Sequence, residues 1–135
     1  MTHMKTISDK TLGVVLMIFS SFGLILGLLA IFDIVSSKYV WGGRATDHNQ
    51  LIILETVTFI VNGLILWLIA MRVNFAKQKI STKTLNILFI ILSIMMALNT
   101  IGNIFAKTSA EKFMAIPTLI GAIGFYVLAR RKSPR

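Results

Sequence analysis

Two sets of polar side chains lie inside long apolar stretches, and their types and spacing suit the binding of a small molecule or an ion. The sets are Glu55, Thr58 and Asn62, at i, i+3 and i+7, and Asn99, Asn103 and Lys107, at i, i+4 and i+8. Either spacing places its members on one face of an α-helix. An ionisable group inside a membrane span usually faces the bundle interior or a cavity, so Glu55 marks a candidate site.

We expect the two polar stripes to meet in one pocket that opens toward the outer side of a membrane. The helix that carries Glu55 begins outside near Leu51, which places this carboxylate about 6 Å below the outer boundary. The second stripe runs the opposite way and also ends outside. The expected ligand-binding residues are Glu55, Asn62, Asn99 and Asn103 in the pocket, Arg44 and Lys107 at its mouth, and Trp41 in a lid above it.

Each of these residues also has a purely structural interpretation. Glu55 lies close to the interface, where it would pair with Arg44 or Lys107 and brace the helix ends. Amides in membrane spans more often hold helices together than bind ligands, since each such hydrogen bond is worth roughly 0.6 to 2 kcal/mol. Trp41 and the two glycines after it would then form a plain turn anchored by an interfacial ring. The alternative function is therefore a noncatalytic accessory or scaffold subunit of a membrane complex.

Four long apolar runs position these residues and predict an all-α membrane protein. The runs cover residues 12–35, 51–71, 85–105 and 113–129. The first, of about 24 residues, is long enough to cross a ~30 Å hydrocarbon core, and the last, of about 17, is at the lower limit. Hydrophobic residues make up 56% of the chain, and the mean hydropathy is +0.81. Since lipid tolerates no open strand edge, residues 1–135 are expected to form one up-down-up-down four-helix bundle.

The distribution of basic residues predicts how this bundle is oriented. Ten of the fourteen Lys and Arg residues fall in the N-terminal segment, the middle connection and the C-terminal tail, where Asp9 is the only acidic residue. The outer side as a whole is balanced, with Lys38, Arg44, Lys107 and Lys112 against Asp33, Asp47, Glu55 and Glu111. Short loops rich in Lys and Arg stay in the cytoplasm, so both termini are expected inside. The first run is expected to be a retained helix, because it is too long for the core of a signal peptide.

Composition and motifs argue against several functional classes. The formal charge of +9 is explained by the cytoplasmic segments, so we expect the bilayer and not a nucleic acid as the partner. The chain contains no cysteine, which excludes disulfides and thiolate metal sites. Asp47, His48 and Glu55 include a single histidine and make a poor metal site. We expect no enzyme activity, because no nucleophile with a base or metal cluster can be assembled, and no cofactor.

Gly23 and Gly27 in the first run have the GxxxG spacing that lets membrane helices approach closely, and Ser20 lies on the same face. We expect this face to pack inside the bundle. The alternative is that it forms the contact of a homodimer or of another membrane protein.

Several short motifs resemble those of a set of small four-span bacterial membrane proteins that carry no assigned activity. The motifs are Trp41-Gly42-Gly43-Arg44, Glu55, Asn62, Asn99-Thr100, Gly102-Asn103, Ala106-Lys107, Glu111 and Pro117-Thr118, and they cover roughly the last two-thirds of the chain. The resemblance implies a bacterial plasma membrane and no particular substrate.

Overall fold

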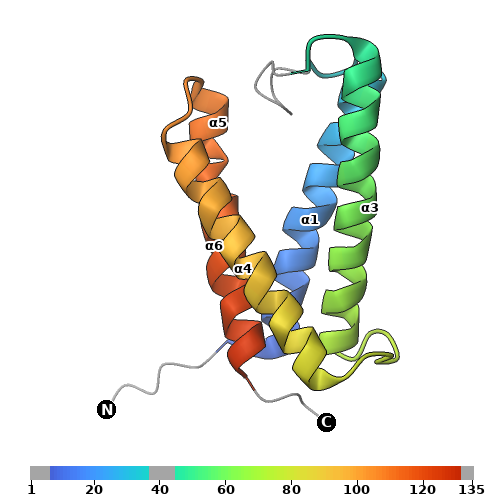
Figure 1. The fold of residues 1–135 in the computed structure, drawn as a ribbon, viewed down its shortest axis with the longest axis vertical. Coiled ribbons are helices and arrows are strands. Elements are labelled where there is room, and N and C mark those ends of the chain that lie inside the picture. Colours follow the sequence, from blue (N-terminus) through green and yellow to red (C-terminus); the bar gives the residue numbers. More distant parts are fainter. Residues whose placement is uncertain (1–6, 37–44, 132–135) are drawn as a thin grey trace.

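The computed structural model describes residues 7–36 and 45–131, and these residues form helices and turns without any strand (Figure 1). The helices are α1 (Asp9–Ile31), α3 (His48–Arg72), α4 (Thr82–Ile104), α5 (Ser109–Phe113) and α6 (Ala115–Arg130). Four segments are long and apolar enough to cross a membrane: α1, α3, α4 and the combined segment Ser109–Arg130. The predicted helical class is thus confirmed, as is the prediction of four helices long and apolar enough to span a membrane.

Hydroxyl or carboxylate side chains fix where the first three long helices begin. Ser8 accepts a hydrogen bond from the Thr11 amide before α1, at 3.1 Å. Asp47 accepts one from the Gln50 amide before α3, at 2.7 Å. Ser81 plays the same part before α4. Such N-caps satisfy amides that have no partner within the helix.

α1 ends four residues earlier than the apolar run predicts, because the backbone reverses at Asp33. Asp33 adopts a positive φ of 55°. The Ile34 amide donates to the Leu29 carbonyl at 2.9 Å, and the Asp33 amide donates to Ala30. This pair of bonds is the Schellman motif, which terminates a helix whatever the hydropathy of the residues that follow. The predicted boundary at Val35 was therefore wrong.

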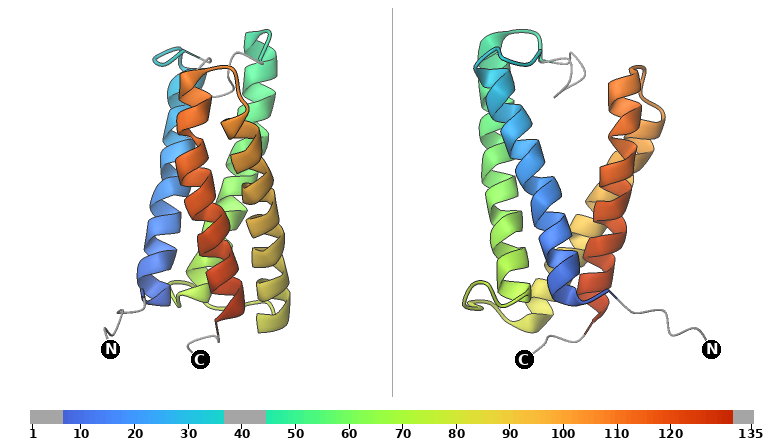
Figure 2. Two further views of the ribbon diagram at one scale, coloured as in Figure 1. Left: turned by 90° about the vertical axis from the view of Figure 1, so that its left-hand side faces the viewer. Right: turned by 180° about the vertical axis from the view of Figure 1, so that it is seen from behind.

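The long helices pack as two antiparallel hairpins, α1 with α3 and α4 with α6 (Figures 1 and 2). The hairpins meet where α1 begins and α6 ends, and they diverge toward the other end. We call these the closed end and the open end. The short helix α5 lies at the open end (Figure 1).

The hydrophobic core lies in the half of the molecule next to the closed end. Its buried residues are Leu16, Ile65, Ile69, Met71, Leu85, Phe89, Leu92, Phe125, Leu128 and Ala129. The rings of Phe89 and Phe125 stack with their centroids 5.9 Å apart. Leu16 of α1 contacts Gly124 of α6, where an added Cβ would lie 2.8 Å from the leucine Cδ2. The glycine therefore permits the approach of one hairpin to the other.

Candidate functional site

Glu55 of α3 is fully buried, with 0% of its surface exposed, and packs against Gly27 of α1. An ideal Cβ placed on Gly27 would lie only 2.0 Å from Oε2 and 2.8 Å from Cδ of Glu55. The carboxyl group thus occupies the space that a side chain on α1 would fill. Gly27 of the GxxxG pair is used inside the chain, whereas an added Cβ at Gly23 would meet nothing within 4 Å.

Asn62 continues the contact between α1 and α3. Ser20 Oγ of α1 donates to Asn62 Oδ1 at 2.9 Å, and Asn62 Nδ2 donates to the Thr58 carbonyl at 2.9 Å. Thr58 in turn donates to the carbonyl of Leu54. The polar stripe of α3 therefore makes contacts within the α1–α3 hairpin. Asn62 bonds to α1, and Asn62 and Thr58 both bond to backbone carbonyls of α3 itself.

The second stripe is not used in this way, and only Asn99 and Asn103 lie on α4, because the helix ends at Ile104, before Lys107. Asn99 and Lys107 are exposed and Asn103 is partly buried. Neither asparagine side chain makes a hydrogen bond to any other residue of the ranges 7–36 and 45–131. The neighbouring Thr100 instead faces α6, where its Oγ1 lies 3.0 Å from Oγ1 of Thr118.

The two stripes do not meet, contrary to the expectation of one shared pocket. The stripe of α3 contacts α1, and α4 packs mainly on α6. A glycine lies at each contact, since Gly27 of α1 leaves room for Glu55, and Gly121 of α6 lies against Met96 of α4. Spacing along one helix shows which residues share a face, but it does not show which helix that face meets. Trp41 and Arg44 lie outside the described residues, and ligand binding by the set stays a prediction.

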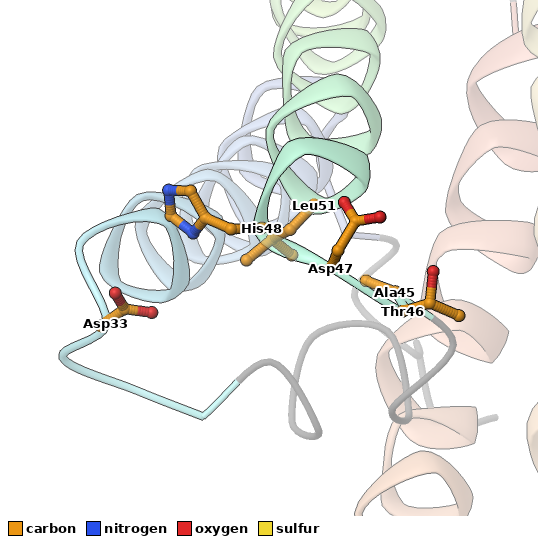
Figure 3. Close-up of a pocket in the computed structure, with 6 residues that line it drawn as sticks. All are labelled: Asp33, Ala45, Thr46, Asp47, His48 and Leu51. Atoms are coloured by element: carbon orange, nitrogen blue, oxygen red, sulfur yellow. The ribbon is translucent and has the colours of Figure 1, made fainter.

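A small pocket of about 210 Å³ lies at the open end, around the start of α3 (Figure 3). It is lined by Asp33, Ala45, Thr46, Asp47, His48 and Leu51. The side chains of Asp33 and His48 lie on one side of it, and those of Asp47 and Thr46 lie on the other (Figure 3). Asp47 already accepts the hydrogen bond that caps α3. Within the described ranges, no three His, Asp or Glu side chains gather as metal ligands.

Arg72 is the residue whose role the sequence did not indicate. Its side chain is 1% exposed, although the charge pattern groups it with the residues of the cytoplasmic connection. Nη1 donates to Asn86 Oδ1 of α4 at 2.9 Å, and Nη2 donates to the carbonyl groups of Leu128 and Arg131 at the end of α6. One signal was present: Arg72 follows the buried Ile65 and Ile69 at i+7 and i+3 and so shares their face.

Arg131 extends these contacts to α1. Its Nη1 donates to Asp9 Oδ1 at 2.9 Å and to the carbonyl of Ile7. We call Arg72, Asn86, Arg131 and Asp9 the closed-end network. Its hydrogen bonds link all four membrane-length segments at the end where the hairpins meet.

No family model matches the chain, and no curated protein or solved structure is detectably similar to it. No fold family or activity can therefore be carried over from another protein. The resemblance to small four-span bacterial membrane proteins stays a prediction.

One face of α4 remains available for interaction in the open half of the molecule. Met95, Asn99 and Gly102 follow one another at i, i+4 and i+7, and all three are exposed. An added Cβ at Gly102 would meet nothing within 4 Å. We call these three residues the Asn99 face.

Proposed function

We propose that this protein is a noncatalytic accessory or scaffold subunit of a membrane complex, and that its Asn99 face binds a membrane-spanning helix of another protein. The observation that carries the proposal is the exposed Asn99 amide, which has no hydrogen-bond partner among the described residues. Other polar side chains of the spans, such as Ser20, Asn62 and Ser93, bond to the chain's own helices.

The physical argument rests on the cost of an amide in lipid. Moving an amide from water into an apolar medium without a hydrogen bond costs roughly 2 to 7 kcal/mol. Asn99 lies five residues before the end of α4, about 8 Å along the helix. A partner helix can supply the missing hydrogen bond, and Gly102 on the same face allows its backbone to come close. Amides and small residues are characteristic of such helix contacts.

We infer that the closed end faces the cytoplasm of a bacterial cell, with both termini on that side. The bias of Lys and Arg toward the segments at this end supports the orientation. The chain has no cysteine, so a single cysteine can be introduced as a reporter. In intact cells, a membrane-impermeant maleimide should label K112C at the open end and should label K77C only after permeabilisation. The reverse pattern would show that the orientation is wrong.

The second candidate is a protein that binds or helps to transport a small molecule or an ion at the open end. It is favoured by Asn103 and Lys107, whose side chains make no hydrogen bond within the described part of the chain. In this function E55Q should alter the ligand profile without altering folding. The burial of Glu55 against Gly27 favours the scaffold function instead.

Photocrosslinking from within the membrane separates the two functions. A benzophenone amino acid in place of Met95 would lie on the Asn99 face, and the same amino acid in place of Ile60 would lie on α3. Met95 and Ile60 are both exposed, by 49% and 62%, so either replacement should be tolerated. We expect a discrete protein adduct from position 95, and lipid adducts alone from position 60.

Adding N99L to the position-95 variant provides the decisive comparison, since leucine fills similar space without the amide. The protein adduct should be lost if Asn99 holds the partner. An adduct of twice the chain mass would identify a second copy instead of another protein. Lipid adducts alone from position 95 would refute the scaffold function.

A further inference from the structure

A groove of about 560 Å³ lies between the first turns of α4 and the last turn of α6, at the closed end. It is lined by Lys83, Asn86, Ile87, Ile90, Ile91, Ala129 and Arg130. The groove is separate from the Asn99 face, which lies in the open half. Its lining changes from charged and polar to apolar along α4.

Two basic side chains, Lys83 and Arg130, lie at the polar end of the groove. Lys83 lies in the first turn of α4 and Arg130 is the last residue of α6. Both are exposed, and neither forms an ion pair with any other residue in 7–36 or 45–131. Two positive groups on adjacent helices without internal counter-charges favour an anionic occupant.

Asn86, which lines the same groove, supplies a hydrogen-bond donor. Its Oδ1 accepts from Arg72 Nη1 at 2.9 Å. A guanidinium group has only donors, so the amide oxygen must be the atom that faces Arg72. The Nδ2 group is thereby left with two N–H donors, and it has no acceptor within the described ranges. The buried Arg72 thus fixes an amide whose free donors can bind an oxyanion.

The remaining lining is suited to a hydrocarbon chain. Ile87, Ile90 and Ile91 follow Asn86 on α4 and extend about 8 Å along the helix toward the middle of the molecule. Ile87 and Ile91 are about half exposed. An inorganic anion would bind the cations and the amide, but it would gain nothing from these three side chains.

We propose that this groove binds one anionic phospholipid of the leaflet at the closed end. Its phosphate accepts hydrogen bonds from Asn86 Nδ2 and lies between Lys83 and Arg130, while part of an acyl chain lies along the three isoleucines. Basic pockets between spans on the cytoplasmic side suit anionic headgroups. The assignment to the cytoplasmic leaflet rests on the orientation inferred above, whereas binding at the groove is independent of the Asn99 face.

Lipid titration of the purified full-length protein in mild detergent tests this proposal, with native mass spectrometry to count bound lipids. Wild type should retain one phosphatidylglycerol in preference to phosphatidylcholine. The variant K83Q/R130Q should bind phosphatidylglycerol more weakly by roughly fivefold for each cation removed. The control K77Q/K79Q removes the same charge from the adjacent connection and should bind as wild type does. An equal loss in both variants, or no preference in wild type, would overturn the proposal.

The variant N86D tests the donor itself. A carboxylate keeps an oxygen for Arg72 but presents a second oxygen to the groove in place of the N–H donors. Phosphatidylglycerol affinity should fall by roughly tenfold, without a fall in melting temperature. Unchanged binding by N86D would refute the assignment. Excess inorganic phosphate should not displace the lipid, and full displacement would show that the groove is a site for free anions only.

Discussion

At Gly27 the absence of a side chain sets how closely α1 approaches α3. The carboxyl group of Glu55 occupies the space beside this glycine and is fully buried there. Burying an ionisable group costs free energy unless neighbouring groups interact favourably with it. The position of Glu55 therefore constrains how α1 and α3 pack in their hairpin. Asn62 and Ser20 reinforce the same contact about two turns nearer the closed end.

Replacing Gly27 by alanine should therefore destabilise the protein. The new Cβ would lie 2.0 Å from Glu55 Oε2, so the carboxylate or the whole helix must move. We expect a loss of about 1 to 3 kcal/mol in the free energy of unfolding. Unfolding by sodium dodecyl sulfate in mixed micelles would measure it.

Gly23→Ala is the matched control, since an added Cβ there meets nothing within 4 Å. This variant should be as stable as wild type or slightly more stable, because alanine is the better helix former. Equal stability of the two variants would contradict the packing of Glu55 on Gly27.

At the scale of elements, side chains and backbone reversals set the lengths of the helices more than hydropathy does. A residue with positive φ lies two positions after the last residue of α1 and of α3, namely Asp33 at 55° and Asn74 at 62°. After each, an amide reaches back to a carbonyl five residues earlier, from Ile34 to Leu29 and from Phe75 to Ala70. Aspartate and asparagine tolerate this conformation better than most residues, and glycine tolerates it best.

Substitution at Asp33 should change stability in opposite directions according to this backbone preference. Asp33→Gly relieves the left-handed conformation and should stabilise the protein by about 0.5 to 1 kcal/mol. Asp33→Val should destabilise it by about 1 kcal/mol, because a β-branched residue strongly disfavours positive φ. Thermal unfolding followed by far-ultraviolet circular dichroism would measure both variants. A stabilising valine would contradict the Schellman ending.

For the whole molecule, the closed-end network and the core beside it are what join the two hairpins. Arg72 of α3 bonds to α4 and to the end of α6, and Arg131 bonds to Asp9. The last carbonyls of α6 lack partners within their own helix, so a buried guanidinium acts as their cap. Toward the open end the hairpins separate (Figure 2).

Loss of the Arg72 side chain should weaken the packing of the α1–α3 hairpin against the α4–α6 hairpin. Arg72→Ala leaves the Asn86 oxygen and two carbonyls of α6 without their donor, and we expect about 2 to 4 kcal/mol of destabilisation. Arg72→Lys should fall between wild type and alanine, because an ammonium group cannot reproduce the planar fork. Lys77→Ala, in the exposed connection, is the control. Unfolding in mixed micelles is the measurement, and an Arg72→Ala variant as stable as the control would contradict this role.

The apolar runs were sufficient to predict the helical class of the molecule. A span needs about 20 apolar residues in sequence, and that requirement is local, so the existence of four helices could be read directly. Pairing of the spans was not predictable in the same way. The stripe containing Glu55 and Asn62 was correctly placed on one face of a helix, but that face meets Gly27 and Ser20 of α1 and not the asparagines of α4.

Local composition thus established which segments are helical and apolar, and which residues share a face. Tertiary packing decided what each face contacts, because that depends on shape at single positions far apart in the chain, such as Gly27 beside Glu55 and Gly124 beside Leu16. Tertiary packing also buries Arg72, which the charge pattern had grouped with the exposed residues of a connection. The guanidinium group can cap the carbonyl groups of α6 only when the fold brings the end of α6 within hydrogen-bonding distance of it. The residues next to Arg72 in the sequence do not indicate that contact.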